Sequence, residues 1–327
     1  MQNARLPVTI ISGFLGSGKS TVLNALLRNP ELSDTAVIVN EFGEIGLDHL
    51  LVESALDEMI LLDNGCLCCS VRGDLADTLA DLLRRVNEGR IPRFQRVMVE
   101  TTGLADPAPI VKTLISHEAT AARYVPSHIV TTVDAVTGLD TLKQCREARS
   151  QVAMADLLIV TKSDMAEADV PNVSRAARSL NPNAAIEIAD RGEIDPTLLF
   201  DDRSQIDIAA LCSGIAPDGS ETPHLWDIRS VSIVLEAALP WSALTAWLEW
   251  LVSMRGPDIL RIKGLLRVQG YDGPVLVQGV QHVFHTPVAL PEWPDDDQRS
   301  RIVIIARDIP ETALRESLAK FEAQANS

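Results

Sequence analysis

The N-terminal segment has residue types and spacing suited to phosphate binding. Residues 13–20 read Gly-Phe-Leu-Gly-Ser-Gly-Lys-Ser and fit G-x-x-x-x-G-K-[ST], the phosphate-binding loop of nucleoside triphosphatases. In such a loop the backbone N–H groups surround phosphate oxygens, the lysine reaches the β- and γ-phosphates, and the final hydroxyl binds Mg²⁺. The alternative, an ordinary glycine-rich turn, does not explain the strand-like run before the segment or the helical pattern after it. We therefore expect nucleotide contacts from Gly13, Gly16, Ser17, Gly18, Lys19, Ser20 and Thr21.

A second segment supplies the acidic part that a triphosphatase needs. The apolar run Val97-Met98-Val99 ends in Glu100, and Thr101-Thr102-Gly103 follows. Glu100 is expected to hold Mg²⁺ together with Ser20, and the Gly103 N–H to sense the γ-phosphate. The alternative for Glu100 is a solvated carboxylate at a strand end. The predicted catalytic residues are Lys19, Glu100 and Gly103.

A third segment indicates which base is bound. Thr161-Lys162-Ser163-Asp164 follows another apolar run and is similar to the N-K-x-D motif that reads guanine. Asp164 would accept hydrogen bonds from guanine N1–H and its 2-amino group, and the Lys162 stem would lie over the base. Adenine offers no such donor pair, so the carboxylate would be left unpaired. Thr161 stands where Asn is usual, yet the pattern favours GTP over ATP.

Three thiols lie close together in Cys66-Leu67-Cys68-Cys69, which we expect to form a tight turn at a strand end. Thiolates are soft ligands suited to tetrahedral Zn²⁺. Cys66 and Cys68 would lie on the same side if the segment is extended, and Cys69 would either join them or pack inside. Buried structural cysteines are the alternative, and for Cys145 and Cys212 that interpretation is preferred.

These side chains need a scaffold, and the apolar pattern predicts one. Up to about residue 190, strand-like runs alternate with helical patterns, and several runs are apolar throughout, as in a parallel sheet covered on both faces. The pattern predicts a doubly wound, mostly parallel α/β domain with its ligands at the carboxyl ends of the strands. The expected strands are 8–11, 36–39, 59–62, 96–99, 129–133, 157–160 and 185–188, with helices near 19–28, 75–86 and 110–115.

The rest of the chain has a different order of elements. A stretch rich in Asp, Ser, Gly and Pro predicts a connector at 191–224, between a nucleotide domain at 1–190 and a smaller domain at 225–327. The second domain is expected to be α+β, with its helices on one sheet face. Its predicted elements, in order β-α-β-β-β-α, are 228–235, a helix opening at Pro240, 260–268, 274–283, 301–306 and 311–323.

Bulk composition narrows the function classes. A net charge of −16 argues against non-specific nucleic-acid binding and against adhesion to an anionic membrane. No apolar run reaches the ~18 residues of a membrane span, and the first residues do not resemble a signal peptide. Five cysteines, three of them clustered, make a poor disulfide framework. We expect a cytoplasmic protein.

Taken in order, these motifs carry a family resemblance. The chain resembles the CobW-type metal-chaperone GTPases, a family of SIMIBI-class P-loop GTPases, and within it the bacterial YjiA branch. The resemblance spans nearly the whole chain. The segments that carry it are 13–20, Asn40-Glu41-Phe42-Gly43-Glu44, 65–69, 100–107 and 161–164, with Arg261-Ile262-Lys263-Gly264 and Gln278-Gly279-Val280-Gln281 in the second domain.

The resemblance implies a GTPase that uses Mg²⁺, binds Zn²⁺ or Co²⁺, and couples nucleotide state to metal delivery to a client protein. It assigns the metal to Cys66, Cys68 and Cys69, and places Glu41 and Glu44 at switch I as candidates for Mg²⁺ or metal contact, with solvated loop carboxylates as the alternative. A homodimer is compatible with it. The chain lacks a His-rich tract, which argues against a metal-storage role. His49 and His117 are candidate extra ligands, for which ordinary histidines are the preferred interpretation, and His282 and His285 are assigned to a strand.

Switch I, the cysteines and Glu100 are all expected at the carboxyl ends of strands, on the same side of the sheet as the phosphate loop. We therefore hypothesise that GTP binding assembles the thiolate site and that hydrolysis loosens it. No water-positioning Gln or arginine finger is evident, so a slow intrinsic rate is expected. One alternative is a metal-binding assembly factor or activator of a metalloenzyme, of the nitrile hydratase activator type, whose slow GTPase is incidental. A small-molecule kinase is a weaker alternative, because it leaves Asp164 and the cysteines without a role.

Overall fold

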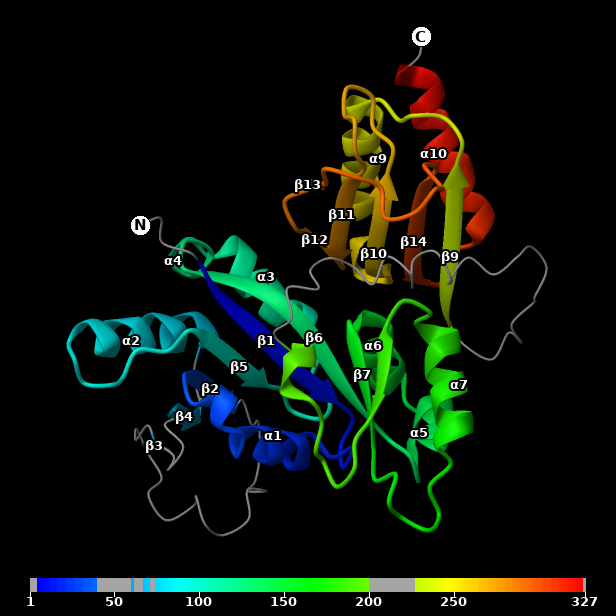
Figure 1. Ribbon diagram of the computed structural model, residues 1–327. Helices are drawn as coiled ribbons and strands as arrows, with labels where there is room; N and C mark the ends of the chain where they lie inside the picture. The colour runs from blue at the N-terminus through cyan, green and yellow to red at the C-terminus, as the bar shows by residue number, and fades with distance from the viewer. Residues whose placement is uncertain (1–4, 40–59, 62–66, 71–73, 200–226, 326–327) are drawn as a thin grey trace. The chain divides into compact units, whose positions relative to one another are not determined.

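The computed structural model describes residues 5–39, 60–61, 67–70, 74–199 and 227–325. Contacts divide the chain into two compact units, one holding an eight-stranded sheet and the other a six-stranded sheet (Figure 1). The sequence-based limits of 1–190, 191–224 and 225–327 stay a prediction. Most of the expected connector lies outside the described residues.

The first sheet is parallel apart from one edge pair. Its strand order is β3-β4-β2-β5-β1-β6-β7-β8, and only β3 and β4 pair antiparallel within the described residues. Parallel neighbours need crossover connections, which the helices between the strands supply. The strands are β1 Leu6–Gly13, β2 Thr35–Val39, β3 Ile60–Leu61, β4 Leu67–Ser70, β5 Arg96–Glu100, β6 Tyr124–Asp134, β7 Leu157–Thr161 and β8 Ala185–Ile188.

Both faces of this sheet are buried. Ile11, Val37 and Met98 pack in one cluster with the apolar side of the first helix, while the alternating residues Ile10 and Ile38 are equally buried. Successive strand residues face opposite sides, so both sides are covered. The doubly wound, mostly parallel fold is confirmed. The helices are α1 Lys19–Leu27, α2 Leu75–Asn87, α3 Ala108–Ser116, α4 Glu118–Ala121, α5 Gly138–Gln144, α6 Arg146–Met154 and α7 Val170–Leu180.

The cysteine segment differs from the turn expected at a strand end. Cys68 and Cys69 lie inside β4, whose backbone pairs with Val37 and Ile38 of β2. Strand β2 is buried along its length, and β4 supplies hydrogen-bond partners for its backbone groups. The Gly65-Cys66 step suggested a turn, but β-pairing with β2 extends the chain immediately after it.

The second unit is an antiparallel sheet with two helices on one face. Its core joins Trp247 of α9 and Leu314 of α10 to Ile262, Ile302 and other residues from one side of the sheet. The α+β prediction is therefore confirmed. The elements are β9 Ile228–Leu235, α9 Trp241–Arg255, β10 Ile259–Leu266, β11 Val275–Val280, β12 Val283–Phe284, β13 Val288–Ala289, β14 Ser300–Arg307 and α10 Glu311–Ala325.

The expected strand at 274–283 is interrupted by a turn. Gln281 has φ 51°, and β11 folds back there onto β12. His282 and His285 flank β12 rather than lying in a strand, so their assignment to a strand was wrong. A left-handed turn usually carries Gly or Asn. Neither residue is present at position 281, so nothing in the sequence indicated the turn.

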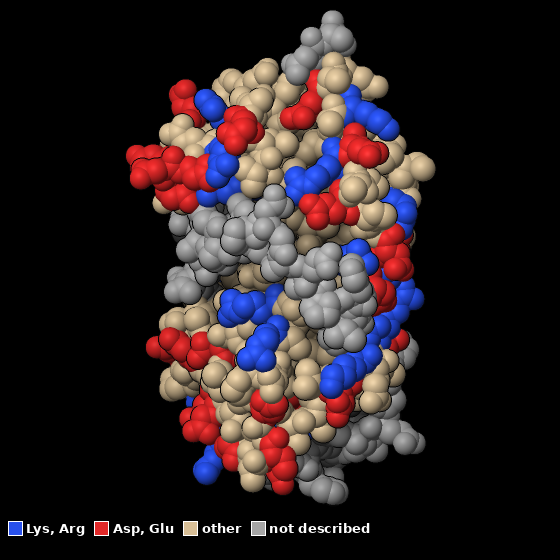
Figure 2. Space-filling view, turned by 90° about the vertical axis from the view of Figure 1, so that its right-hand side faces the viewer, with Lys and Arg blue, Asp and Glu red and all other residues tan. Residues whose placement is uncertain are grey.

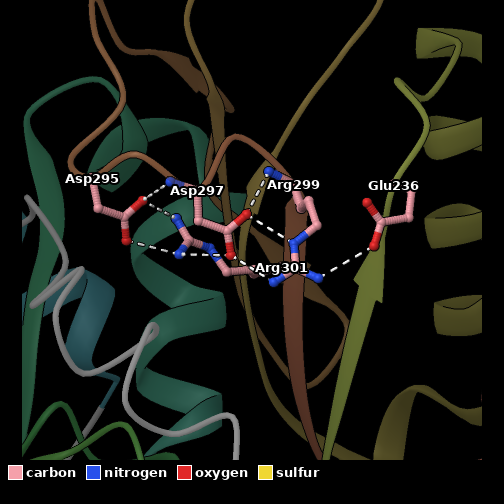
Figure 3. A network of polar contacts seen from close by, with 5 residues as sticks. All are labelled: Glu236, Asp295, Asp297, Arg299 and Arg301. Atoms are coloured by element: carbon pink, nitrogen blue, oxygen red, sulfur yellow. Dashed lines mark hydrogen bonds and ion pairs between the residues drawn. The ribbon is translucent and has the colours of Figure 1, made fainter.

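Charged side chains form a network beside β14 (Figure 3). The Arg301 guanidinium is buried and donates to both oxygens of Asp295, at 2.8 and 3.0 Å. Arg299 donates to Asp297 at 2.9 Å through Nε and also reaches Glu236 at 3.2 Å. The Arg299 hydrogen bond lowers the pKa of Asp297 to about 2 and outweighs the opposing effect of burial.

Acidic and basic side chains are interspersed on the face shown in Figure 2. The coloured residues there do not gather into one large patch of a single sign, although the chain carries a net charge of −16. Among the described residues, no helix has both the length and the apolar character needed to span a membrane.

Candidate nucleotide site

The phosphate loop connects β1 to α1 and crosses the end of β6. Gly13 has φ 141°, and a Cβ there would lie 2.2 Å from Thr132 Oγ1 and 2.7 Å from Ser17 Oγ. Only glycine fits this position. The Ser17 and Thr132 hydroxyls are themselves 2.6 Å apart. The loop is therefore held to β6 by a buried contact between two hydroxyl groups. Gly16 and Gly18 lie in the same loop, before the first turn of α1.

Lys19 lies within the loop that it is predicted to serve. Its Nζ donates to the carbonyl oxygens of Gly13 at 2.9 Å and Phe14 at 3.1 Å. The side chain is mostly buried, so the ammonium is already drawn toward the place where phosphate oxygens would sit. An incoming phosphate would exchange these neutral acceptors for charged ones, which form stronger hydrogen bonds.

Ser20 and Glu100 meet at the head of α1. The Ser20 hydroxyl donates to Glu100 Oε1 at 2.9 Å. Glu100 is 4% exposed and ends β5, the neighbour of β1 in the sheet. A hydroxyl beside a carboxylate is a suitable oxygen donor set for Mg²⁺, and the structure brings together the two predicted magnesium ligands.

The residues after Glu100 form a tight turn against the phosphate loop. Ala105 N donates to Thr102 O at 3.1 Å. A Cβ at Gly103 would lie 2.7 Å from the backbone N and Cα of Leu15, so this contact requires glycine. The third predicted catalytic residue therefore lies in backbone contact with the loop that would hold the phosphates.

Thr161 ties the predicted base-reading segment to the phosphate loop. Its hydroxyl donates to Ser17 O at 2.7 Å and approaches Val133 O at 3.3 Å. The residue is buried at the end of β7. A threonine hydroxyl can thus join the two segments in the position where the motif usually has asparagine.

Lys162 is fixed by an ion pair that sequence analysis missed. It has φ 55°, and its Nζ lies 2.6 Å from Asp134 Oδ2 at the end of β6. Burial tends to raise the pKa of Asp134, but the Lys162 hydrogen bond and the backbone N–H groups of Val136 and Thr137 outweigh it, and the pKa is lowered. The lowered pKa favours the ionised form of Asp134, which pairs with Lys162 two positions before Asp164 in the sequence.

The outer part of this segment is open. Asp164 is exposed, while the Ser163 hydroxyl donates to Ala189 O at 2.7 Å just after β8. Three residues on, Gly192 packs against Thr21 of α1, where a Cβ would lie 2.9 Å from Thr21 Cγ2. The chain after β8 therefore borders the same end of the sheet.

Several residues of this site gave no signal in the sequence. Thr132 and Asp134 are among the last residues of β6 and have no recognisable spacing, and Gln151 lies in the middle of α6. Gln151 Nε2 donates to the carbonyl oxygens of Gly103 and Ala105 at 3.2 and 3.0 Å. Contacts between distant segments are needed to identify these residues as part of the site. Asp134 is a partial exception, because an acidic residue at the end of a strand between β1 and β7 is a reasonable site candidate.

Other predicted site residues lie outside the described part of the chain. These are Glu41, Glu44, His49 and Cys66, while only the backbone of Cys68 and Cys69 is described. Among the described residues, no group of three or more His, Cys, Asp or Glu could hold a metal ion. His117 is exposed at the C-terminal end of α3. The thiolate site stays a prediction.

Two family models match this chain. Residues 7–187 match the CobW/HypB/UreG nucleotide-binding domain. Residues 228–322 match the cobalamin synthesis protein CobW C-terminal domain.

Characterised proteins are similar over nearly the whole length. The zinc chaperone YjiA of Escherichia coli is 34% identical, with 96% of this chain and 98% of that protein covered. The zinc chaperone CobW of Pseudomonas aeruginosa is 31% identical, with 96% and 91% covered. A crystal structure of Zn(II)-bound YjiA GTPase from E. coli superposes with a TM-score of 0.74, at 32% identity and with 97% and 99% covered.

Proposed function

The chain belongs to the CobW/HypB/UreG family of nucleotide-binding proteins, and from this we propose that it is a GTP-hydrolysing metallochaperone that binds Zn²⁺ and delivers it to a client protein. It acts as a GTPase, as YjiA is described. Zinc is proposed because similar proteins are named zinc chaperones. Thiolate sites bind Co²⁺ as well, so Co²⁺ is a second candidate.

The GTPase residues divide the chemistry among them. Lys19 contacts the β- and γ-phosphates, and the Gly103 N–H contacts the γ-phosphate. Ser20 and Glu100 would hold Mg²⁺, which neutralises charge that develops on the phosphates. Thr161 positions the base-reading segment, and Asp164 reads guanine. No water-positioning glutamine and no arginine finger is assigned in this scheme, so a slow intrinsic rate is expected.

The proposed metal site uses Cys66, Cys68 and Cys69, with Glu41 and Glu44 near it. Three thiolates would bind Zn²⁺ directly, leaving one position of a tetrahedron for another ligand. An incomplete protein ligand set suits a metal that must later be transferred. It suits a permanent structural zinc less well, because structural sites usually have four protein ligands.

One observation carries the coupling between nucleotide and metal. In the sheet register, Val39 of β2 is paired with Glu100 on one side and with Ser70, directly after Cys69, on the other. In the sequence, the segment that contains Glu41 and Glu44 follows directly after β2. A change in this segment on GTP binding would therefore reach both the magnesium ligand and the cysteine strand.

The test is Zn²⁺ affinity measured by competition with a chromophoric chelator, with GDP and with a non-hydrolysable GTP analogue. Coupling predicts affinities that differ by about tenfold or more. Cys66→Ala and Cys68→Ala should each weaken Zn²⁺ binding, while Cys145→Ala, which alters a thiol on another part of the domain, should not. Equal Zn²⁺ affinity in both nucleotide forms would contradict the coupling.

A second experiment separates the proposal from its alternatives. If a captured client metalloenzyme is activated by wild type but not by Lys19→Ala, GTP use drives delivery. Activation that survives Lys19→Ala indicates an assembly factor with incidental GTPase. GTP turnover without an added acceptor excludes a small-molecule kinase. Delivery to a client metalloprotein, a homodimeric state and a cytoplasmic location stay predictions.

A further inference from the structure

Gln151 of α6 is a buried side chain that the nucleotide motifs leave without a role. It is 1% exposed, and a buried amide is costly unless its polar atoms are hydrogen-bonded. Its Nε2 donates to Gly103 O at 3.2 Å and to Ala105 O at 3.0 Å. One side chain therefore holds two carbonyl groups of the turn that follows Glu100.

That turn is restrained from three directions. It is closed by the Ala105 to Thr102 hydrogen bond, it packs against Leu15 of the phosphate loop through Gly103, and it is held by Gln151. The hydrogen bond within the turn determines its shape, whereas the contacts with Leu15 and Gln151 determine its position relative to the phosphate loop. Just before the turn, Thr101 N also donates to Ile11 O at 2.9 Å. Within the turn, the Gln151 side chain donates to the carbonyl oxygens of Gly103 and Ala105, and these hydrogen bonds restrain the direction of both peptides.

Gln151 is itself anchored. Thr131 of β6 donates through its hydroxyl to Gln151 O at 3.1 Å. Gln151 also lines a cavity of about 20 Å³ together with Ser17, Thr132 and Asp134, which is enough room for one water molecule. Its Oε1 is buried and makes no hydrogen bond within the described part of the chain. Such a water would satisfy this oxygen and fix the orientation of the amide.

We propose that Gln151 is a positioning residue for GTP hydrolysis, which holds the Thr102–Ala105 turn against the phosphate loop so that the Gly103 N–H is in place for the γ-phosphate. This inference rests on the proposed GTPase function. GDP lacks the γ-phosphate, so loss of this restraint should lower kcat while leaving GDP affinity nearly unchanged. Interactions that strengthen only in the transition state affect kcat in this way.

The test compares Gln151→Leu and Gln151→Glu with wild type, by single-turnover GTP hydrolysis and by GDP affinity. Gln151→Leu removes both donated hydrogen bonds, and we expect hydrolysis to be about tenfold slower with GDP affinity within about threefold of wild type. Gln144→Leu, at the exposed end of α5, is the matched control and should match wild type in both measurements.

Gln151→Glu adds a readout that a purely structural role would not produce. An ionised carboxylate would face two carbonyl oxygens, whereas a protonated one regains a donor. Burial, and Asp134 as the charged residue lining the same cavity, would raise the pKa of the new carboxyl group. The hydrolysis rate relative to wild type should therefore increase as pH is lowered from about 8 to about 6.

The outcomes are distinguishable. If wild type hydrolyses GTP and Gln151→Leu retains the full rate, or loses GDP binding in parallel with rate, the inference is overturned and the proposed function stands. If wild type does not hydrolyse GTP, the proposed function itself fails. If Gln151→Leu does not fold, the Gln151→Glu rate decides, and a pH-independent ratio to wild type overturns the inference.

Discussion

The Ser20 hydroxyl donates a hydrogen bond to Glu100 Oε1 at 2.9 Å, across 80 positions of sequence. Ser20 lies in the first turn of α1 and Glu100 ends β5, and the parallel pairing of β1 with β5 brings these points together. The oxygen atoms assigned to Mg²⁺ are thus adjacent in the folded chain itself. A site arranged in advance loses less entropy when its ligand binds.

Glu100→Gln tests this arrangement. The amide keeps the size of the side chain but removes the charge that would hold Mg²⁺, so we expect GTP hydrolysis to fall by about 100-fold. GDP binding without Mg²⁺ should change little. Phosphate release measured across a Mg²⁺ titration checks this, with Glu118→Gln, at an exposed position, as control. Unchanged Mg²⁺ dependence would show that Glu100 does not hold the metal.

Asp164→Asn tests base recognition. The amide keeps one oxygen, which can accept from the guanine N1–H, but it turns an N–H group toward the 2-amino group and so leaves that donor without an acceptor. We expect GTP affinity to fall by about 100-fold, and affinity for xanthosine triphosphate, which has a carbonyl oxygen in place of the 2-amino group, to rise. Competition binding with the two nucleotides measures the change. Retained preference for GTP would exclude Asp164 as the reader.

The Asp134–Lys162 pair predicts a pH-dependent stability difference. The pKa of Asp134 is lowered in the folded chain, so its contribution is present above the unfolded value, near 3.8, and is lost as pH falls through the lower folded value. Asp134→Asn should lower the free energy of unfolding by about 1 kcal/mol at neutral pH, where Lys162 loses a charged partner. The difference between the two proteins should shrink as pH falls below about 3.8 and close below the lower folded pKa.

Thermal unfolding followed by circular dichroism, at a series of pH values, measures this difference. Asp140→Asn is the control, because Asp140 pairs with Lys143 at the surface of α5 and 75% of its side chain is exposed. A difference between wild type and Asp134→Asn that stays constant down to pH 3 would contradict the assigned pair.

The sequence was sufficient where residue type and spacing together define the chemistry. The phosphate loop, Glu100 with Gly103, and Thr161–Asp164 could be recognised because each follows an apolar strand and carries a residue that its role requires. The sheet could be predicted for a related reason. Buried parallel strands such as β2 and β7 are apolar on both faces, and few other structures require such runs.

The remaining features depend on contacts between distant segments. Asp134 and Gln151 act through partners 28 and 46–48 positions away, and neither has a local pattern that marks it. Strand β4 forms because Leu67–Ser70 pair with the backbone of β2, and the residue types of this segment alone do not predict a strand. The Gln281 turn uses a left-handed conformation without the glycine or asparagine that would reveal it.

In the second unit, the Asp297–Arg299 pair predicts a stability difference at acid pH that tryptophan fluorescence can measure. Arg299 donates to Asp297 and lowers its pKa to about 2 from an ordinary value of 3.8 (Figure 3). The pair's stabilisation is therefore fully present above about pH 4 and is lost as pH falls through about 2. Asp297→Asn should be less stable than wild type at neutral pH, by a small amount because the pair is partly exposed, and equally stable at the acid limit.

Tryptophan fluorescence can follow this unit selectively, because all five tryptophans of the chain lie after residue 225. Urea unfolding at pH 7, 4 and about 2 should give a wild-type midpoint above that of Asp297→Asn at the first two values, with the gap closing at the third. Asp296→Asn removes a neighbouring exposed carboxylate and controls for the change in net charge. If Asp296→Asn reproduces the whole effect, the cause is overall charge and not the Asp297–Arg299 pair.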